Sequence, residues 1–395
     1  MTSSQVDAEI THRIEGLQRL LAEKGIDGAL VTERIDLFYF TGTDQDAHLW
    51  VPARGTPLLM VRKSVARAVE DAAIKRIVPL NGFSHLPQLI RAHQGDLPKH
   101  MGLELDVLPM RFYRMYEKHF PDVELLDVWP LIRKVRMTKS PYELDCLKKG
   151  AQLADQMYEK VPEFLKEAKT ENDLAARVEY FYRSHGHPGL VPARGYNQVP
   201  LYGHILAGAH GALPSNSSGA TGGRGMGPFL SQGAGMGKLR RNEPIMLDYT
   251  GNVTGYNADQ TRIFVIGELD AEFRNAHEVM REIQDTVARE GRPGVVAADL
   301  YELALGMARE AGLDKTFMGY PDPVSFVGHG VGLELNEWPV IGRGLKTVLE
   351  EGVTLAIEPK VVFPGRGVVG IENTFVVTPE GMERLNRFPD DIVVC

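Results

Sequence analysis

The sequence predicts an α+β protein of two domains, and three observations support this. Its 395 residues exceed what one compact core usually spans. Early in the chain, short apolar runs alternate with amphipathic ones, as in a small α/β domain. After Leu190, strand-like runs and glycine-rich turns dominate. We therefore expect domains at residues 1–136 and 137–395.

Composition limits the class of protein. The chain is 43% hydrophobic and 24% charged, as ordinary globular proteins are. Its net charge of -8 offers no basic surface for nucleic acid, so none is expected as a partner. Two cysteines are too few for a disulfide framework, and no apolar stretch approaches the roughly 18 residues that span a bilayer. Residues 1–8 do not resemble a signal peptide, so we expect a cytoplasmic protein without membrane contact.

The N-terminal domain should begin with a helix. Residues 8–24 place their apolar side chains on one helical stripe, and Gly25 follows as a C-cap. Short apolar runs then predict strands, with a helix at 64–73 among them. These runs are 29–32, 37–41, 49–51, 58–61, and segments near Ile77 and Leu103.

The second domain should open with two capped helices. Ser140 and Glu143 form a capping-box pattern, with Pro141 at the first helical position. The helix that follows is expected to bend near Pro162. A second helix should run from Thr170 to Tyr182.

A glycine-rich segment at 215–237 is expected to be a long loop. Loops of this length are usually functional or mobile. Its run at 222–227 completes neither a dinucleotide fingerprint nor a P-loop, since no Gly-Lys-Ser/Thr follows. Nucleotide binding is therefore not expected.

Two predicted hairpins each carry a pair of acids. Asp248 and Asp259 lie on β-prone runs, with the turn-rich pentad 251–255 midway between them. Such residues sit opposite or diagonally adjacent, with Cβ atoms about 5–8 Å apart. Glu358 and Glu372 repeat the arrangement around Gly365. Buried carboxylates at this range repel unless a cation lies between them.

Between the hairpins, His329 is flanked by glycines and can supply a nitrogen ligand. Taken singly, an acid in a strand is usually solvated, and a histidine between glycines is usually a turn residue. Two acid pairs placed symmetrically about their turns, with an imidazole between them, instead favour a metal site.

These residues resemble a known family. Asp248, Asp259, His329, Glu358 and Glu372 are separated by 11, 70, 29 and 14 residues. With the runs 328–333, 357–359 and 371–374, they resemble the pita-bread metallohydrolases, which include prolidase, Xaa-Pro aminopeptidase, methionine aminopeptidase and the metal-free creatinase. The resemblance covers nearly the whole chain and implies a C-terminal pita-bread domain behind a smaller creatinase-like α/β domain.

The resemblance also implies roles and partners. Asp248 would bind one divalent ion, and His329 and Glu358 the other, while Asp259 and Glu372 would bridge both. Glu358 is also counted as catalytic. Two ions of Mn, Co, Zn or Fe would activate a water and polarise the scissile carbonyl of a small peptide or amide. A homodimer is implied, and residues 46–50, with Trp50, are a candidate for closing the partner's cleft.

Several positions depart from the prolidase pattern. Asn336 stands where a histidine is usual, Ser215 also replaces a histidine, and Gly370 and Val340 stand where many members have arginine. His204 and His210 lie near Ser215 in sequence, and either is a candidate donor or acid; exposed loop histidines are the alternative.

Three functions remain open. The first is hydrolysis of a small peptide or amide bond, of the Xaa-Pro peptidase type. The second uses the same fold and metal site for creatinase-like C–N hydrolysis or a metal-assisted lyase reaction. The third is a binding protein that has lost catalysis, which the complete ligand set disfavours because a buried anionic cluster destabilises the apo fold.

Overall fold

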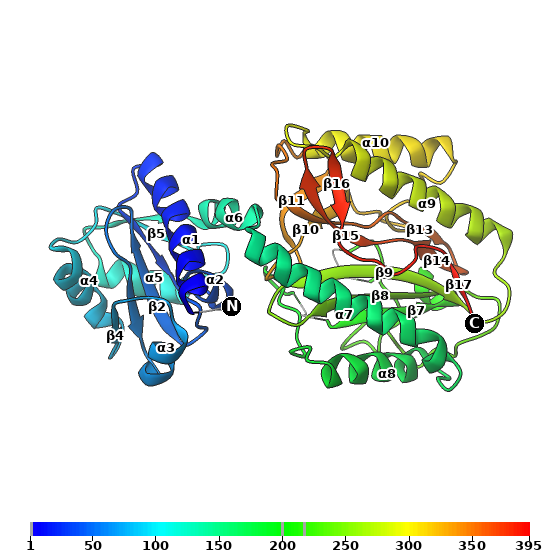
Figure 1. Ribbon diagram of the computed structural model, residues 1–395, viewed down its shortest axis with the longest axis horizontal. Helices are drawn as coiled ribbons and strands as arrows, with labels where there is room; N and C mark the ends of the chain where they lie inside the picture. The colour runs from blue at the N-terminus through cyan, green and yellow to red at the C-terminus, as the bar shows by residue number, and fades with distance from the viewer. Residues whose placement is uncertain (1–2, 199–200, 216–218) are drawn as a thin grey trace. The chain divides into compact units, whose positions relative to one another are not determined.

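The computed structural model describes residues 3–198, 201–215 and 219–395. The chain divides into two compact units. One contains Met1–Arg136 with Gly195–Asn197, and the other contains Met137–Arg194 with Gln198–Cys395. Both mix helices and sheets, as predicted (Figure 1).

The first unit is built on a six-stranded sheet in the order β4-β3-β2-β1-β5-β6. Strand β2 pairs antiparallel with β1 and β3, and the remaining pairs are parallel. The strands are β1 (Gly28–Val31), β2 (Ala47–Pro52), β3 (Leu58–Val61), β4 (Ile77–Pro79), β5 (His100–Leu103) and β6 (Glu124–Asp127). The helices are α1 (Ser3–Glu23), α2 (Arg34–Thr41), α3 (Val65–Asp71), the 3-10 turn η1 (Phe83–His85), α4 (Leu86–Gln94), α5 (Met110–His119) and α6 (Trp129–Met137).

One strand expected in this unit was wrong. The run 37–41 belongs to helix α2, because the Glu33 carboxylate caps the N-terminus and Gly42 ends the helix in the left-handed region. In such a short run of apolar residues, the hydrophobic pattern does not distinguish a helix from a strand. In the run 46–50, Trp50 is fully buried, and its indole N–H donates to Gln94 at 2.7 Å, whereas Asp46 is exposed. A role of this run at a partner's cleft stays a prediction.

The second unit layers strands between two helix pairs (Figure 1). Its helices are α7 (Pro141–Leu165), α8 (Glu171–Ser184), the 3-10 turn η2 (Gly208–Ala212), α9 (Ala271–Glu290) and α10 (Ala297–Glu310). Its strands are β7 (Gly203–Ala207), β8 (Ile245–Asn252), β9 (Asn257–Val265), β10 (Phe326–Gly330), β11 (Glu337–Gly342), β12 (Thr354–Ile357), β13 (Lys360–Phe363), β14 (Gly367–Gly370), β15 (Asn373–Thr378), β16 (Gly381–Arg384) and β17 (Val393–Val394).

These strands form sheets in the orders β17-β9-β8-β7, β11-β10-β12-β15-β16 and β13-β14. Apolar residues of α7 and α8 pack against β7, β8 and β9 in one core cluster. Residues of α9 and α10 pack against β10, β12, β14 and β15 in another. Each helix pair therefore covers one side of the strands, and the polar residues described below lie between the two cores.

The helix starts in this unit are confirmed. Ser140 with Glu143, and Thr170 with Asp173, both form capping boxes. Helices α9 and α10 were not anticipated among the strands expected after Leu190. In the glycine-rich segment 215–237, the described residues form no helix or strand, and residues 216–218 lie outside the described part.

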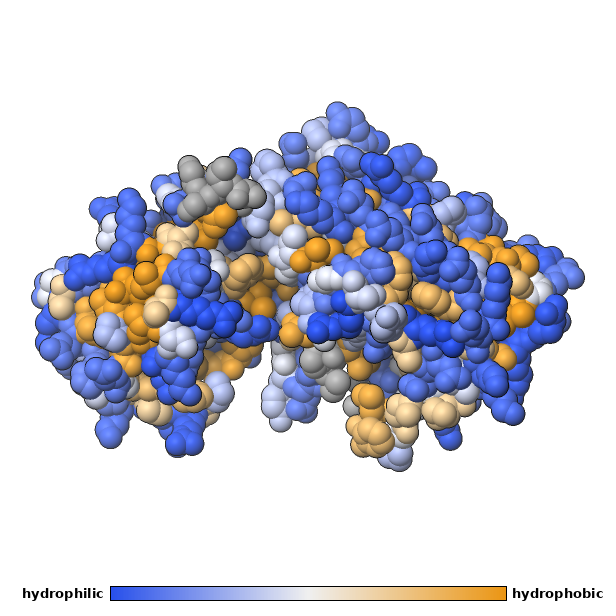
Figure 2. Space-filling model, turned by 60° about the horizontal axis from the view of Figure 1, so that its bottom comes forward, coloured by the Kyte–Doolittle hydropathy of each residue, from blue (hydrophilic) through white to orange (hydrophobic). Residues whose placement is uncertain are grey.

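Figure 2 shows mostly hydrophilic side chains on the face in view, with apolar ones gathered in patches. Within the described chain, no helix combines the length and the apolar character needed to cross a membrane.

Candidate metal centre

The first acid pair lies on the β8–β9 hairpin. Asp248 pairs with Thr261 and Thr250 pairs with Asp259, so the two acids are diagonal neighbours on the same face. This is one of the two arrangements expected from the sequence. The Thr250 hydroxyl donates to Oδ1 of Asp259 at 3.1 Å and holds that carboxylate in place.

The second pair lies on a longer, interrupted hairpin. Strand β12 pairs with β15 at Ile357 and Asn373, and β13 pairs with β14 at Lys360 and Gly370. Both pairs share one register, which places Glu358 and Glu372 opposite each other in the gap between them. A single bridge joins Glu372 to Thr261 of β9 and brings the two hairpins together.

His329 reaches the acids from β10, where it pairs with Ala356 of β12. Its Nε2 lies 3.6 Å from Oε1 of Glu358, 3.8 Å from Oε1 of Glu372 and 3.9 Å from Oδ2 of Asp259. These distances are too long for hydrogen bonds. They suit ligands that share one ion, since bonds of about 2.1 Å in tetrahedral array set ligands about 3.4 Å apart.

The structure therefore brings Asp259, His329 and Glu372 together as a buried group that could hold a metal ion. Oε1 of Glu358 faces the same imidazole nitrogen at 3.6 Å and is a candidate for a fourth donor. One imidazole and three carboxylates are a donor set suited to Mn, Fe, Co or Zn. The residues present fit one divalent cation at this position.

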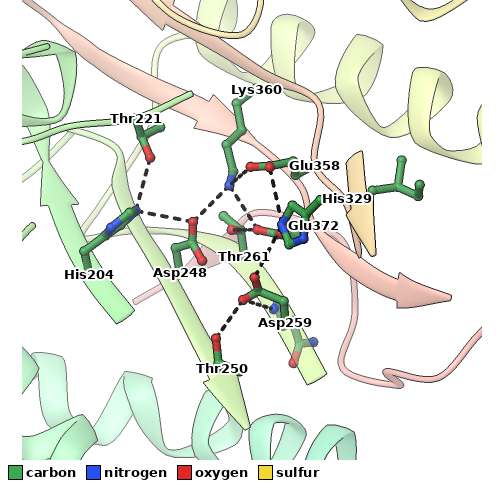
Figure 3. A network of polar contacts seen from close by, with 12 residues as sticks. His204, Thr221, Asp248, Thr250, Asp259, Thr261, His329, Glu358, Lys360 and Glu372 are labelled. Carbon is green, nitrogen blue, oxygen red and sulfur yellow. Dashed lines mark hydrogen bonds and ion pairs between the residues drawn. The ribbon is translucent and has the colours of Figure 1, made fainter. Parts of the chain in front are cut away.

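Asp248 faces a different cation. Figure 3 shows Lys360 extending into the cluster between Asp248, Glu358 and Glu372. Its Nζ lies 2.9 Å from Oδ2 of Asp248, 2.7 Å from Oε2 of Glu358 and 3.0 Å from Oε2 of Glu372. The lysine side chain is only 2% exposed. Three carboxylate oxygens that could bind a second metal are thus already paired with an ammonium group.

The pKa values reflect this division. Burial alone would raise the pKa of Asp248, but Lys360 and His204 outweigh burial and hold it below its usual range. Burial, together with Glu372 and Asp248, raises the pKa of Asp259 well above its usual value. Burial also raises the pKa of Glu372 to about 7, against the attraction of Lys360. Without a metal, Asp259 and Glu372 are therefore the acids whose charged forms are disfavoured.

The candidate donors divide between two places. Nε2 of His204, on β7, lies 3.3 Å from Oδ2 of Asp248 and 3.1 Å from the Thr221 hydroxyl, beside the cluster (Figure 3). His210, on η2, instead places Nδ1 3.3 Å from Glu171, whose carboxylate also accepts from the backbone N–H groups of Ala207 and Gly235. Glu171 belongs to α8, so this contact joins η2 to that helix.

The other unusual positions also have definite places. Asn336 is half-buried in the bends before β11, where the buried Lys139–Glu337 pair at 2.8 Å fixes the chain. Val340 pairs with His329 across β10 and β11, and Gly370 pairs with Lys360 across β13 and β14. Ser215 is half-buried directly before residues 216–218.

Sequence reasoning missed Lys360, Thr250 and Thr261. A simple signal marks all three: each lies two residues after a cluster acid, at Glu358, Asp248 and Asp259, and so shares its face of the strand. The Thr261 hydroxyl donates to Oε2 of Glu372 at 2.8 Å. A lysine two residues after an acid in an otherwise apolar run is also unusual enough to notice.

This fold and donor set are typical of a metal-dependent hydrolase. The model of metallopeptidase family M24 matches residues 145–379, and that of the creatinase/prolidase N-terminal domain matches residues 13–138. The chain belongs to metallopeptidase family M24. The predicted family and fold class, a pita-bread domain behind a creatinase-like one, are confirmed.

Similar proteins span the whole chain. The Xaa-Pro dipeptidase of Pyrococcus horikoshii is 26% identical, with 97% of this chain and 99% of that protein aligned. The probable dipeptidase PepE of Mycobacterium tuberculosis is 28% identical, and the alignment covers 100% of this chain and 99% of that protein. Among solved structures, dipeptidase PepE from Mycobacterium ulcerans superposes with a TM-score of 0.81 at 25% identity, covering 98% of both chains. Xaa-Pro dipeptidase from Bacillus anthracis reaches 0.84 at 24% identity, covering 98% and 100%.

Proposed function

We propose that this protein is a metal-dependent peptidase that cleaves small peptides, with Xaa-Pro dipeptides as the leading substrate class. The observation that carries the proposal is the buried group of Asp259, His329 and Glu372, with Glu358 facing the same point. The names of the similar proteins, Xaa-Pro dipeptidase and dipeptidase, support the substrate class. From the family resemblance we also propose a cytoplasmic homodimer.

A divalent ion such as Mn, Co, Zn or Fe, when bound here, supplies Lewis acidity toward a carbonyl and lowers the pKa of a coordinated water. The chain's own residues arrange the surroundings. Thr250 and Thr261 orient the carboxylates of Asp259 and Glu372. The side chain of His204 is 13% exposed, and its Nε2 lies 3.3 Å from Oδ2 of Asp248. We propose that an imidazole at this place donates a hydrogen bond to a substrate or to the oxyanion of a tetrahedral intermediate.

A second candidate is hydrolysis of a C–N bond in another small polar molecule, such as creatine. Asn336 favours it, because an amide at this place cannot carry the charge that a histidine can. A half-buried Asn is also able to accept a hydrogen bond from a neutral polar group.

A substrate panel separates the two candidates. Chelator-treated protein would be reloaded with Mn or Co and offered Xaa-Pro dipeptides, dipeptides without proline, and creatine. We expect metal-dependent cleavage of Xaa-Pro dipeptides. Cleavage of creatine alone would favour the second candidate, and equal turnover with and without metal would contradict both.

A further inference from the structure

Lys360 is built into the carboxylate cluster as a fixed part of it. It lies two residues after Glu358, on the same side of the chain, and its Nζ contacts Asp248, Glu358 and Glu372 at 2.7 to 3.0 Å. An ammonium group has three N–H donors, and these three contacts use all of them. The lysine is therefore completely paired inside the protein.

The two oxygens of Glu358 and of Glu372 face different partners. Their Oε2 atoms accept from Lys360, while their Oε1 atoms face Nε2 of His329 at 3.6 and 3.8 Å. One side of the cluster thus already contains a cation, and the other side has ligand atoms spaced for one. Of these two acids, Glu372 is one that the family resemblance expects to bridge two metal ions.

We propose that the Lys360 ammonium takes the place of one of the two divalent ions expected for this site, so that each chain binds a single ion at Asp259, His329, Glu358 and Glu372. This inference rests on the metal-dependent function proposed above and deepens it. A second ion on Asp248 would need the oxygens that Lys360 holds and would lie against the ammonium, whose positive charge repels it. Four carboxylates balanced by one ammonium and one divalent ion keep a formal charge of only -1.

The backbone around the lysine supports this assignment independently. Gly370 pairs with Lys360 across β13 and β14. A Cβ at Gly370 would lie 2.7 Å from both Cα and Cγ of Lys360 and 2.6 Å from the carbonyl oxygen of Pro359. Because Gly370 has no side chain, the Lys360 side chain can occupy this space and extend to the acids. On its other edge, the backbone of Lys360 bonds to Met318 through both its N–H and its carbonyl.

Metal stoichiometry tests the proposal directly. Full-length protein, freed of metal with a chelator, would be titrated with Mn²⁺ by calorimetry, and bound metal would be counted after dialysis. We expect one ion per chain in the wild type and two in Lys360→Ala, which removes the ammonium and opens its volume. Lys346→Ala, at an exposed lysine of the same unit, is the matched control and should still bind one. The electron paramagnetic resonance spectrum of Mn²⁺ should change from isolated ions to a coupled pair only in Lys360→Ala.

Two ions per chain in the wild type would overturn the proposal, and this measurement needs no variant to fold. A folded Lys360→Ala that binds no more metal than the wild type would overturn it as well. A wild type that binds no metal would overturn both the proposed function and the single-ion assignment. A wild type that binds one ion but cleaves no peptide would overturn the proposed function alone, and one that binds two ions and cleaves peptides would overturn the assignment of Lys360 alone, so the two failures are distinguishable.

Discussion

Lys360 and Gly370 face each other across β13 and β14, and the lysine stem occupies the space that a side chain at 370 would need. The two residues therefore form one structural unit. The arginine expected at 370 from the family resemblance is incompatible with the lysine as placed, so the departure at Gly370 and the ammonium in the cluster have a common cause.

Gly370→Ala should destabilise the protein by about 1–3 kcal/mol, because the added methyl meets backbone atoms that cannot turn aside. Gly306→Ala is the matched control: it lies inside α10, and a Cβ there meets nothing within 4 Å. That change should be neutral or stabilise by about 0.5–1 kcal/mol. Urea denaturation of both variants measures the difference, and equal midpoints would contradict the close packing of Lys360 on Gly370.

Thr261→Val should weaken metal binding about 10- to 100-fold, since the hydroxyl that orients Glu372 is lost while the shape of the side chain is kept. Thr354→Val is the control. Its buried hydroxyl donates to the carbonyl of Val331 at 2.6 Å, so its loss should lower stability and leave metal affinity unchanged. Titration of metal-free protein with Zn or Mn gives both affinities. Equal losses of affinity in the two variants would show that Thr261 has no specific role.

The metal-free protein should lose stability as pH rises from about 5 to 8. Burial raises the pKa of Glu372 from 4.5 to about 7, so the folded state holds a proton that the unfolded state has already released. The stabilisation is complete below pH 4.5 and is lost as pH rises through 7. Asp259 acts in the same direction. Melting temperatures should therefore fall across this window.

Glu372→Gln should flatten this slope, because the amide does not titrate. Added metal should stabilise the wild type more at pH 8 than at pH 5, since metal binding requires deprotonated ligands. Melting curves at both pH values, with and without Mn²⁺, test this. A metal-free melting temperature that rises from pH 5 to 8 would contradict the raised pKa values.

Much of this architecture could be predicted because its signals are local. The helix starts at Ser140 and Thr170 appear where expected, because each N-cap residue finds its partner within three residues. The two acid hairpins could be predicted for the same reason, since residues placed symmetrically about a turn lie opposite each other or diagonally adjacent. Helices α9 and α10 were missed because the residues after Leu190 were interpreted from their strand-like runs and glycine-rich turns.

The rest depends on contacts distant in sequence. His204 meets Asp248 only because β7 pairs with β8, a pairing that no short motif announces. Lys360 approaches Asp248 from 112 residues away. The two-residue spacing between Glu358 and Lys360 is visible in the sequence. That the lysine side chain points into the cluster follows only from how β8 and β13 are brought together in the fold. Sequence reasoning named four of the acids and the imidazole, and missed the positive charge among them.

His204 and His210 should have different roles, although the sequence could not distinguish them. If His204 supplies a hydrogen bond beside the cluster, His204→Ala should lower kcat toward an Xaa-Pro dipeptide about 10²- to 10³-fold, the usual cost of removing one such donor. His204→Gln should recover part of that loss, because its amide also donates. His210→Ala removes a contact with Glu171 at the start of α8 and should affect melting temperature more than kcat. Bound metal should be the same in all three variants, so that a change in kcat is not a change in metal content. Equal losses of kcat in His204→Ala and His210→Ala, or no recovery in His204→Gln, would show that His204 has only a structural role.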